Sequence, residues 1–317
     1  MSETLRAGVI GVGYLGRFHA RIYNDMEGVD LVGVADTDRE TADRVANEYD
    51  TRAFYDPMAL LDEVDVVSVV VPTSLHRKVA VPYLEKGIHM LLEKPVASTL
   101  EDARVIVEMA RKHGATLQIG HLERFNAGIM ALADHVNEPR FIEAHRLGPF
   151  VERATDVDVV TDLMIHDIDI ILSLVGDKLT SVSATGTPVL TDHVDIANAR
   201  LEFANGAVAN VTASRVSNKK FRRIRVFGRN SYRVINFVDQ QLEVAYPGDI
   251  PEGQNYPEIV YETHGITPSQ PLDAELEHFI DVIRQGGEPL VTGEDGMEAL
   301  RVAMLVTDLI RQRNSDS

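Results

Sequence analysis

The sequence contains no cysteine, which excludes disulfide bonds, iron–sulfur clusters and thiol nucleophiles. This absence agrees with a reducing compartment, so we expect a cytoplasmic protein. No stretch approaches the roughly 20 apolar residues that a membrane-spanning helix needs. The first residues, Met1 to Arg6, lack the apolar segment of a signal peptide.

Positive charge is scarce as well. The chain has 31 Lys and Arg residues against 49 Asp and Glu residues, which gives a net charge of −18. We therefore expect neither nucleic acid nor a membrane as a partner, because both are anionic. A ligand that carries phosphate needs a local group of cations or a helix N-terminus. The length of 317 residues favours two domains, since one core rarely grows past about 250–300 residues.

The first part of the chain alternates short apolar runs with amphipathic segments. We expect strands within residues 6–10, 29–35, 62–71, 88–92 and 116–120, with helices between them. Such alternation is typical of a parallel sheet covered by helices on both faces. The sequence therefore predicts an α/β fold whose N-terminal domain, residues 1–121, is a doubly wound Rossmann domain.

A glycine-rich turn directly follows the first expected strand and opens a helix. The pattern G-x-G-x-x-G is met by Gly11, Gly13 and Gly16, with Tyr14 and Leu15 between the last two. In dinucleotide-binding folds the first glycine permits the turn, the second lets a pyrophosphate approach and the third lets helix and strand pack closely. These five residues are our candidates for dinucleotide binding.

Asp36 ends the second expected strand, at the distance from Gly16 where an acidic residue binds the adenosine ribose. A carboxylate there would repel a 2′-phosphate, so we expect NAD rather than NADP. An alternative role is to cap the helix that begins near Asp38, which is compatible with ribose binding.

The fourth expected strand leads into Glu93-Lys94-Pro95. Pro95 ends the strand and restricts Lys94 to an extended backbone. A lysine at the carboxyl end of a buried parallel strand faces the crevice where open α/β sheets bind ligands. The alternative is a strand-end lysine that only reaches solvent.

Pro72-Thr73-Ser74-Leu75-His76 follows the strand within residues 62–71. Thr73 and Ser74 either lie beside a nicotinamide or cap the next helix, and the cap is the simpler role. His76 either contacts cofactor or substrate or serves the structure alone.

Asp162 and His166 interrupt an apolar helix expected over residues 159–172, among other acidic residues at 156, 158, 167 and 169. Residues four apart share one face of a helix, so this pair either forms a functional site or simply a helix-stabilising hydrogen bond. We expect no metal here, because the chain shows no HExxH spacing and no cysteine that would complete a ligand set.

From Lys178 onward the chain alternates polar and apolar residues in long strands, with a hairpin signal at Asn205-Gly206. The second domain, residues 122–317, should therefore be α+β with a large, mostly antiparallel sheet. We expect that sheet to join a homodimer or homotetramer. Residues 247–271 read as a long loop, and the last helix, about 294–311, should pack near the first domain.

A basic segment stands out in this acidic chain. It either forms an anion pocket for a phosphorylated substrate or is a solvated strand edge. Its members are Arg215, Lys219, Lys220, Arg222, Arg223 and Arg225.

The glycine turn, Glu93-Lys94-Pro95 and Asp162-x-x-x-His166, in this order, resemble the Gfo/Idh/MocA family of NAD(P)-dependent oxidoreductases over essentially the whole chain. The resemblance implies that Lys94, Asp162 and His166 are catalytic. It also implies that the cofactor is contacted by Pro72, Thr73, His76, Glu93 and Lys94.

The segment from Gly120 to Asn126 resembles the nucleotide-sugar branch of this family, which oxidises the C3 hydroxyl of a UDP-N-acetylhexosamine. Many members carry a glycine pair where this chain has Asp158-Val159-Val160, so inositol or glucose specificity is not carried over. The expected substrate-binding residues are His121, Arg124, Asp162, His166, Arg215 and Lys219. The alternatives are another sugar, inositol or polyol dehydrogenase of the family, and an NAD-binding regulator without turnover.

Overall fold

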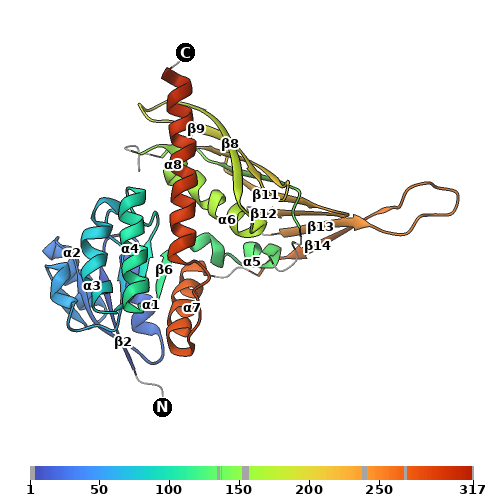
Figure 1. Cartoon of the computed structure of the whole chain (residues 1–317). Coiled ribbons are helices and arrows are strands. Elements are labelled where there is room, and N and C mark those ends of the chain that lie inside the picture. The colour runs from blue at the N-terminus through green and yellow to red at the C-terminus, as the bar shows by residue number, and fades with distance from the viewer. Residues whose placement is uncertain are drawn as a thin grey trace. The chain divides into compact units, whose positions relative to one another are not determined.

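The computed structural model describes residues 4–133, 136, 138–151, 157–237, 241–267 and 270–315. The chain forms two compact units (Figure 1). The first unit runs to Leu122 and takes in Gln270–Leu300, whereas the second begins at Glu123 and takes in the chain from Arg301. Of the acidic residues noted in the sequence, Asp156 lies outside the described residues.

The first unit is built on a six-stranded sheet in the order β3-β2-β1-β4-β5-β6. Every pairing in it is parallel. The order reverses between β1 and β4, which makes the sheet doubly wound and confirms the predicted fold class. The strands are β1 Leu5–Ile10, β2 Val29–Ala35, β3 Arg52–Phe54, β4 Val66–Val69, β5 His89–Glu93 and β6 Leu117–Gly120.

Helices connect these strands and lie on both faces of the sheet (Figure 1). Thr99 caps α4, its hydroxyl accepting the Asp102 amide at 3.1 Å. The predicted capping role of Thr73 and Ser74 is wrong, because both lie in a 3₁₀ turn, Thr73–Leu75, and Leu75 is the N-cap of α3. The helices are α1 Gly16–Asp25, α2 Arg39–Glu48, α3 His76–Glu85, α4 Leu100–His113 and α7 Pro271–Gln285, with a second 3₁₀ turn at Pro57–Leu60.

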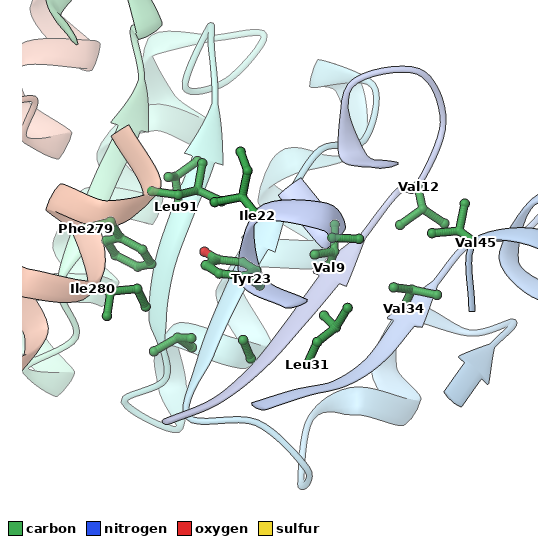
Figure 2. Close-up of a cluster of buried hydrophobic side chains, with 14 of the residues drawn as sticks. Val9, Val12, Ile22, Tyr23, Leu31, Val34, Val45, Leu91, Phe279 and Ile280 are labelled. Carbon is green, nitrogen blue, oxygen red and sulfur yellow. The ribbon is translucent and has the colours of Figure 1, made fainter. Parts of the chain in front are cut away.

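One core of the first unit joins helix α7 to the sheet, although α7 is far away in the sequence. Figure 2 shows Phe279 and Ile280 of α7 beside Tyr23 of α1 and Leu91 of β5. Ion pairing of Arg21 with Asp273 at 3.1 Å helps to hold α7 in place. Residues 270–300, expected in the second domain, belong to the first unit. The sequence does not show this, because an amphipathic helix does not reveal which sheet its apolar face covers.

The second unit is built on an eight-stranded sheet in the order β14-β13-β12-β11-β7-β10-β9-β8. Its pairings are antiparallel except that of β10 with β7, which agrees with the prediction. Gly206 adopts a φ of 82° at the predicted β9–β10 hairpin. The strands are β7 Phe141–Leu147, β8 Leu179–Thr187, β9 Ile196–Phe203, β10 Val208–Ser214, β11 Phe221–Gly228, β12 Ser231–Asn236, β13 Gln241–Pro247 and β14 Ile259–Gly265.

The predicted long loop over residues 247–271 is wrong, because it contains β14, which pairs with β13. Most of β14 is exposed at the sheet edge, so it lacks the apolar alternation that marks a half-buried strand.

The helical segments described beside this sheet are a 3₁₀ turn at Leu122–Phe125, α5 Ala127–Ala133, a π-helix at Val160–Met164 that continues into α6 Ile165–Val175, and the part of α8 (Gly293–Ser315) from Arg301. Among the helices that the structure describes, none combines the length and the apolar character needed to cross a membrane.

A buried ion pair holds the loop between β8 and β9 in the second unit. The carboxylate of Asp195 accepts the amides of Val189, Leu190 and Thr191 at 2.6–2.9 Å and the Nε of Arg215 at 2.7 Å. Asp195 is fully buried and Arg215 is 5% exposed. Burial opposes ionisation of Asp195, but the three amides and the guanidinium outweigh it and lower the pKa of the carboxyl well below its usual range.

Replacing Asp195 with Asn should cost about 3 kcal/mol of folding stability at neutral pH, because it leaves the buried guanidinium without its counter-charge. A lowered carboxyl pKa stabilises the fold above the unfolded-state pKa of about 4, and this contribution is lost as the pH falls. The stability difference between wild type and Asp195→Asn should therefore shrink below about pH 4 in urea titrations. Asp192→Asn, an exposed residue of the same loop, is the control and should change little.

Candidate active site

Two glycines of the turn after β1 are required by the packing of the protein itself. Gly11 has a φ of 85°, and a Cβ there would lie 2.3 Å from the Val70 carbonyl oxygen. A Cβ on Gly16 would lie 1.8 Å from the carbonyl oxygen of Gly11. Any side chain at either position would therefore push α1 away from the ends of β1 and β4.

Gly13 is different, because a Cβ there would meet no atom of the described residues within 4 Å apart from its chain neighbours. The fold alone does not need glycine at this exposed position, whereas a pyrophosphate that approaches the backbone does. Leu15 is the N-cap of α1 and its apolar side chain cannot accept the helix amides. Tyr14, 83% exposed, packs edge-on against Phe18. The turn thus fits the phosphates of a dinucleotide.

Asp36 ties the end of β2 to the glycine turn. One carboxylate oxygen accepts the Val12 amide at 2.9 Å and the other accepts the Asp38 amide at 3.0 Å. The cap of α2 is Asp38 rather than Asp36, since Asp38 accepts the Glu40 amide at 3.1 Å. Each oxygen of Asp36 keeps a further lone pair, which suits the hydroxyls of a ribose.

Glu93 and Lys94 lie at the end of β5, and the Lys94–Pro95 peptide bond is cis. The Glu93 carboxylate accepts the Lys94 amide at 3.2 Å. It also lies against β6, where a Cβ on Gly120 would be 3.0 Å from the carboxyl carbon. Since neighbouring parallel strands end at the same edge, Lys94 shares that edge with the glycine turn and Asp36.

His76 is buried, and its ring nitrogens lie 3.0 Å from the Val71 carbonyl oxygen and 3.3 Å from that of Val96. Burial lowers the pKa of the imidazole, so the ring is neutral at physiological pH. His76 therefore connects the turn after β4 to the segment after Pro95, which supports the structural role. Pro72 and Thr73 precede it at the same edge.

In the second unit, Asp162 lies in the five-residue π-helix and His166 in the first turn of α6. The prediction of an α-helix throughout residues 159–172 is wrong for this first part. π-helical turns are rare and often occur at functional sites, because they shift the register of the side chains that follow.

An ion-pair network missed by the sequence analysis holds α6. Arg146 of β7 donates to both carboxylate oxygens of Asp167 at 2.8 and 2.9 Å and to Glu123 at 3.1 Å. Burial opposes the charge on Arg146, but Asp167 and Glu123 outweigh it and raise the pKa of the guanidinium. Asp167 directly follows His166, so the network anchors the helix that carries the imidazole.

The predicted substrate residues fall into different environments. His121 is buried in the first unit. Arg124 lies 3.5 Å from Asp169 in the second unit, and Lys219 is exposed between β10 and β11.

The structure speaks against Arg215 as a substrate ligand, because its buried guanidinium binds Asp195. Arg222 pairs with Glu123 and stacks on Phe237, whereas Arg225 pairs with Glu143. These three arginines therefore balance carboxylates of their own unit, which argues against the anion pocket, one of the two interpretations of the basic segment.

Comparisons with known proteins agree with this geometry. Residues 5–121 match the family described as an oxidoreductase family with an NAD-binding Rossmann fold, and residues 109–232 match the GFO/IDH/MocA C-terminal domain. The chain belongs to the Gfo/Idh/MocA family of oxidoreductases.

Relatives extend the similarity to the whole chain. UDP-N-acetylglucosamine 3-dehydrogenase of Acidithiobacillus ferrooxidans is 39% identical over 95% of this chain and 96% of its own length. A solved structure of that enzyme superposes with a TM-score of 0.90, covering 96% of this chain and 97% of its own. The NAD⁺-dependent scyllo-inositol 2-dehydrogenase of Bacillus subtilis is 28% identical over 98% of this chain and 95% of its own length.

The two kinds of glycine can be separated by experiment. Gly13→Ala should leave the melting temperature unchanged, since the new methyl group meets no protein atom, and should weaken NADH binding by about tenfold or more. Gly16→Ala should lower the melting temperature, because its methyl group would overlap the Gly11 carbonyl. Thermal unfolding and NADH fluorescence titration measure the two effects. Unchanged NADH affinity in Gly13→Ala would place the dinucleotide elsewhere.

Proposed function

We propose that this protein is an NAD-dependent dehydrogenase that oxidises the C3 hydroxyl of a UDP-N-acetylhexosamine. The observation that carries the proposal is the 39% identity, over 95% of the chain, to UDP-N-acetylglucosamine 3-dehydrogenase. The similarity to an inositol dehydrogenase at 28% identity makes an inositol or another polyol the second candidate substrate.

Lys94, His166 and Asp162 are the proposed catalytic residues. Bound NAD supplies the hydride acceptor. His166 removes the proton from the sugar hydroxyl, and Lys94 donates a hydrogen bond to the oxygen as negative charge develops on it. Asp162 orients the imidazole or binds a neighbouring hydroxyl. An alternative assignment exchanges the proton roles of Lys94 and His166.

The proposed cofactor contacts follow the edge of the first sheet. The turn from Gly11 to Gly16 holds the pyrophosphate and Asp36 holds the adenosine ribose. The carboxylate of Asp36 disfavours a 2′-phosphate, which supports NAD over NADP. Pro72, Thr73, Glu93 and Lys94 lie toward the nicotinamide, and His76 supports their turn.

For the substrate we retain His121, Arg124, Lys219, Asp162 and His166 and omit Arg215, whose guanidinium is committed to Asp195. Lys219, an exposed cation, suits a diphosphate.

The assay is NADH formation from a panel of UDP-N-acetylglucosamine, UDP-glucose, free N-acetylglucosamine and myo-inositol, each with NAD⁺ and NADP⁺. We expect the highest kcat/KM with UDP-N-acetylglucosamine and NAD⁺. Turnover of inositol alone would favour the second candidate, and dinucleotide binding without oxidation of any polyol would indicate a regulator.

Lys94→Ala should reduce kcat by about a hundredfold or more, because the developing charge loses its hydrogen-bond donor, while NADH still binds. The control is Lys112→Ala, an exposed lysine on α4, which should keep normal turnover. Wild-type rates in Lys94→Ala would remove this residue from the mechanism.

We further propose a cytoplasmic homodimer or homotetramer that assembles through the large sheet of the second unit. Supporting this, one face of β7, β11 and β12 carries the partly exposed rings of Phe141, Phe227 and Tyr232. The ring centroid of Phe227 lies 5.6 Å from that of Phe141 and 4.6 Å from that of Tyr232.

Light scattering should therefore show a dimer or tetramer for the wild type and a smaller species for Phe227→Glu, because a charge in an apolar contact is costly. A monomeric wild type at micromolar concentration would disprove the assembly.

A further inference from the structure

A buried carboxyl group that the proposed mechanism does not use lies behind the strand that carries Lys94. Glu275 of α7 is completely buried. Within the described residues, neither of its side-chain oxygens has a hydrogen-bond partner. Its backbone carbonyl accepts the Gln118 side chain of β6 at 3.0 Å. A carboxylate in such a place carries a large desolvation cost, so the group is stable there only as a neutral acid.

The titratable side chains around Glu275 come from two neighbouring elements. The charge of Glu93, at the end of β5, adds to the effect of burial, and together they raise the pKa of Glu275 well above its ordinary value. Tyr23 of α1 also belongs to this core, and burial together with the charge of Glu275 raises the pKa of its hydroxyl. Figure 2 shows Tyr23 between the sheet and the α7 residues Phe279 and Ile280.

A chain of buried groups ends at Glu93. The Tyr23 hydroxyl lies 2.9 Å from the Ser68 hydroxyl, which lies 3.1 Å from Nδ1 of His19. The Nε2 of the same imidazole lies 3.5 Å from a Glu93 oxygen. Glu93 accepts the Lys94 amide at 3.2 Å and lies near this imidazole, whereas neither side-chain oxygen of Glu275 has a partner among the described residues, so Glu93 is the better place for the negative charge of the two glutamates.

We propose that Glu93 and Glu275 form a carboxyl pair that carries one proton and one negative charge behind Lys94, and that this pair discriminates between the two redox states of the bound cofactor. Glu275 holds the proton and Glu93 the charge. The oxidised nicotinamide ring is a cation and the reduced ring is neutral. A cation at the Glu93 end of β5 favours loss of the proton from Glu275, so the pair releases a proton when NAD⁺ binds and keeps it when NADH binds.

This inference rests on the proposed function in one respect, which is that the nicotinamide lies near Glu93. In the ligand-free protein, the protonation of Glu275 follows from its burial and requires no nicotinamide nearby. The two parts can therefore be tested separately, with Glu275→Gln as the principal variant, because glutamine has the shape of a protonated glutamate and no proton to release. Glu275→Met removes the polar group as well. Glu277→Gln, an exposed glutamate of the same helix, is the matched control.

The first measurement is thermal unfolding of the ligand-free protein between about pH 5 and about pH 9. A carboxyl pKa that is raised in the folded state stabilises the protein at low pH, and that stabilisation is lost as the pH rises through the folded-state value. The melting temperature of Glu275→Gln minus that of the wild type should therefore increase with pH, whereas Glu277→Gln should follow the wild type. A difference that stays constant with pH would show that Glu275 carries no extra proton.

The second measurement is the Kd of NAD⁺ and of NADH over the same pH range, with proton release measured by calorimetry in buffers of different ionisation enthalpy. For the wild type, the ratio of NADH Kd to NAD⁺ Kd should rise by up to about tenfold per pH unit while the pair ionises. Glu275→Gln and Glu275→Met should abolish most of this dependence, and Glu277→Gln should preserve it.

The outcomes separate the two hypotheses. If Glu275→Gln binds NAD⁺ and NADH with the same affinities and the same pH dependence as the wild type, the carboxyl pair is overturned and the proposed function stays intact. If the wild type binds neither dinucleotide, the proposed function fails and the cofactor part of this inference fails with it, while the ligand-free unfolding data still decide whether Glu275 is protonated.

Discussion

The close contact between Gly16 and the Gly11 carbonyl oxygen is the constraint on which the first unit depends. It brings the N-terminus of α1 to the end of β1, at the point where the strand order reverses. Asp36 accepts the Val12 amide and so links the end of β2 to the same turn. The edge of the sheet proposed to receive the dinucleotide is thus shaped by backbone contacts that tolerate no side chain, rather than by a group of cations. This explains how a chain of charge −18 can accept a phosphate-bearing cofactor.

The same placement of α1 has a second consequence deeper in the unit. It directs His19 and Tyr23 toward Ser68 in β4 and toward Glu93 at the end of β5. Polar groups inside a core are costly unless they are bonded to one another, and most of these are. Glu275, whose side-chain oxygens have no hydrogen-bond partner among the described residues, reaches this core because α7 returns to the first unit from the far end of the chain.

Buried charges in the second unit follow a different rule, because they are paired. Arg146 bonds to Asp167 and Glu123, and Arg215 bonds to Asp195. Removing one partner of such a pair leaves an uncompensated charge, which makes the pairs effective in fixing the position of the helix and loop that carry them. Three arginines of the basic segment, Arg215, Arg222 and Arg225, therefore neutralise acidic residues that are distant in the chain.

The sequence by itself determined the class of the fold, the glycine turn, Asp36, the strand that ends at Lys94 and the β9–β10 hairpin, because these depend on local periodicity and on residues with special backbone freedom. The same local patterns placed Asp162 and His166 on one helical segment. They did not predict the π-helix around Asp162, the exposed edge strand β14 or the assignment of α7 to the first unit. Only the tertiary structure decided which carboxylate faces each arginine and that Glu275 is buried beside Glu93. Those outcomes depend on contacts between residues tens to hundreds of positions apart, and a side chain's charge does not reveal which distant surface will bury it.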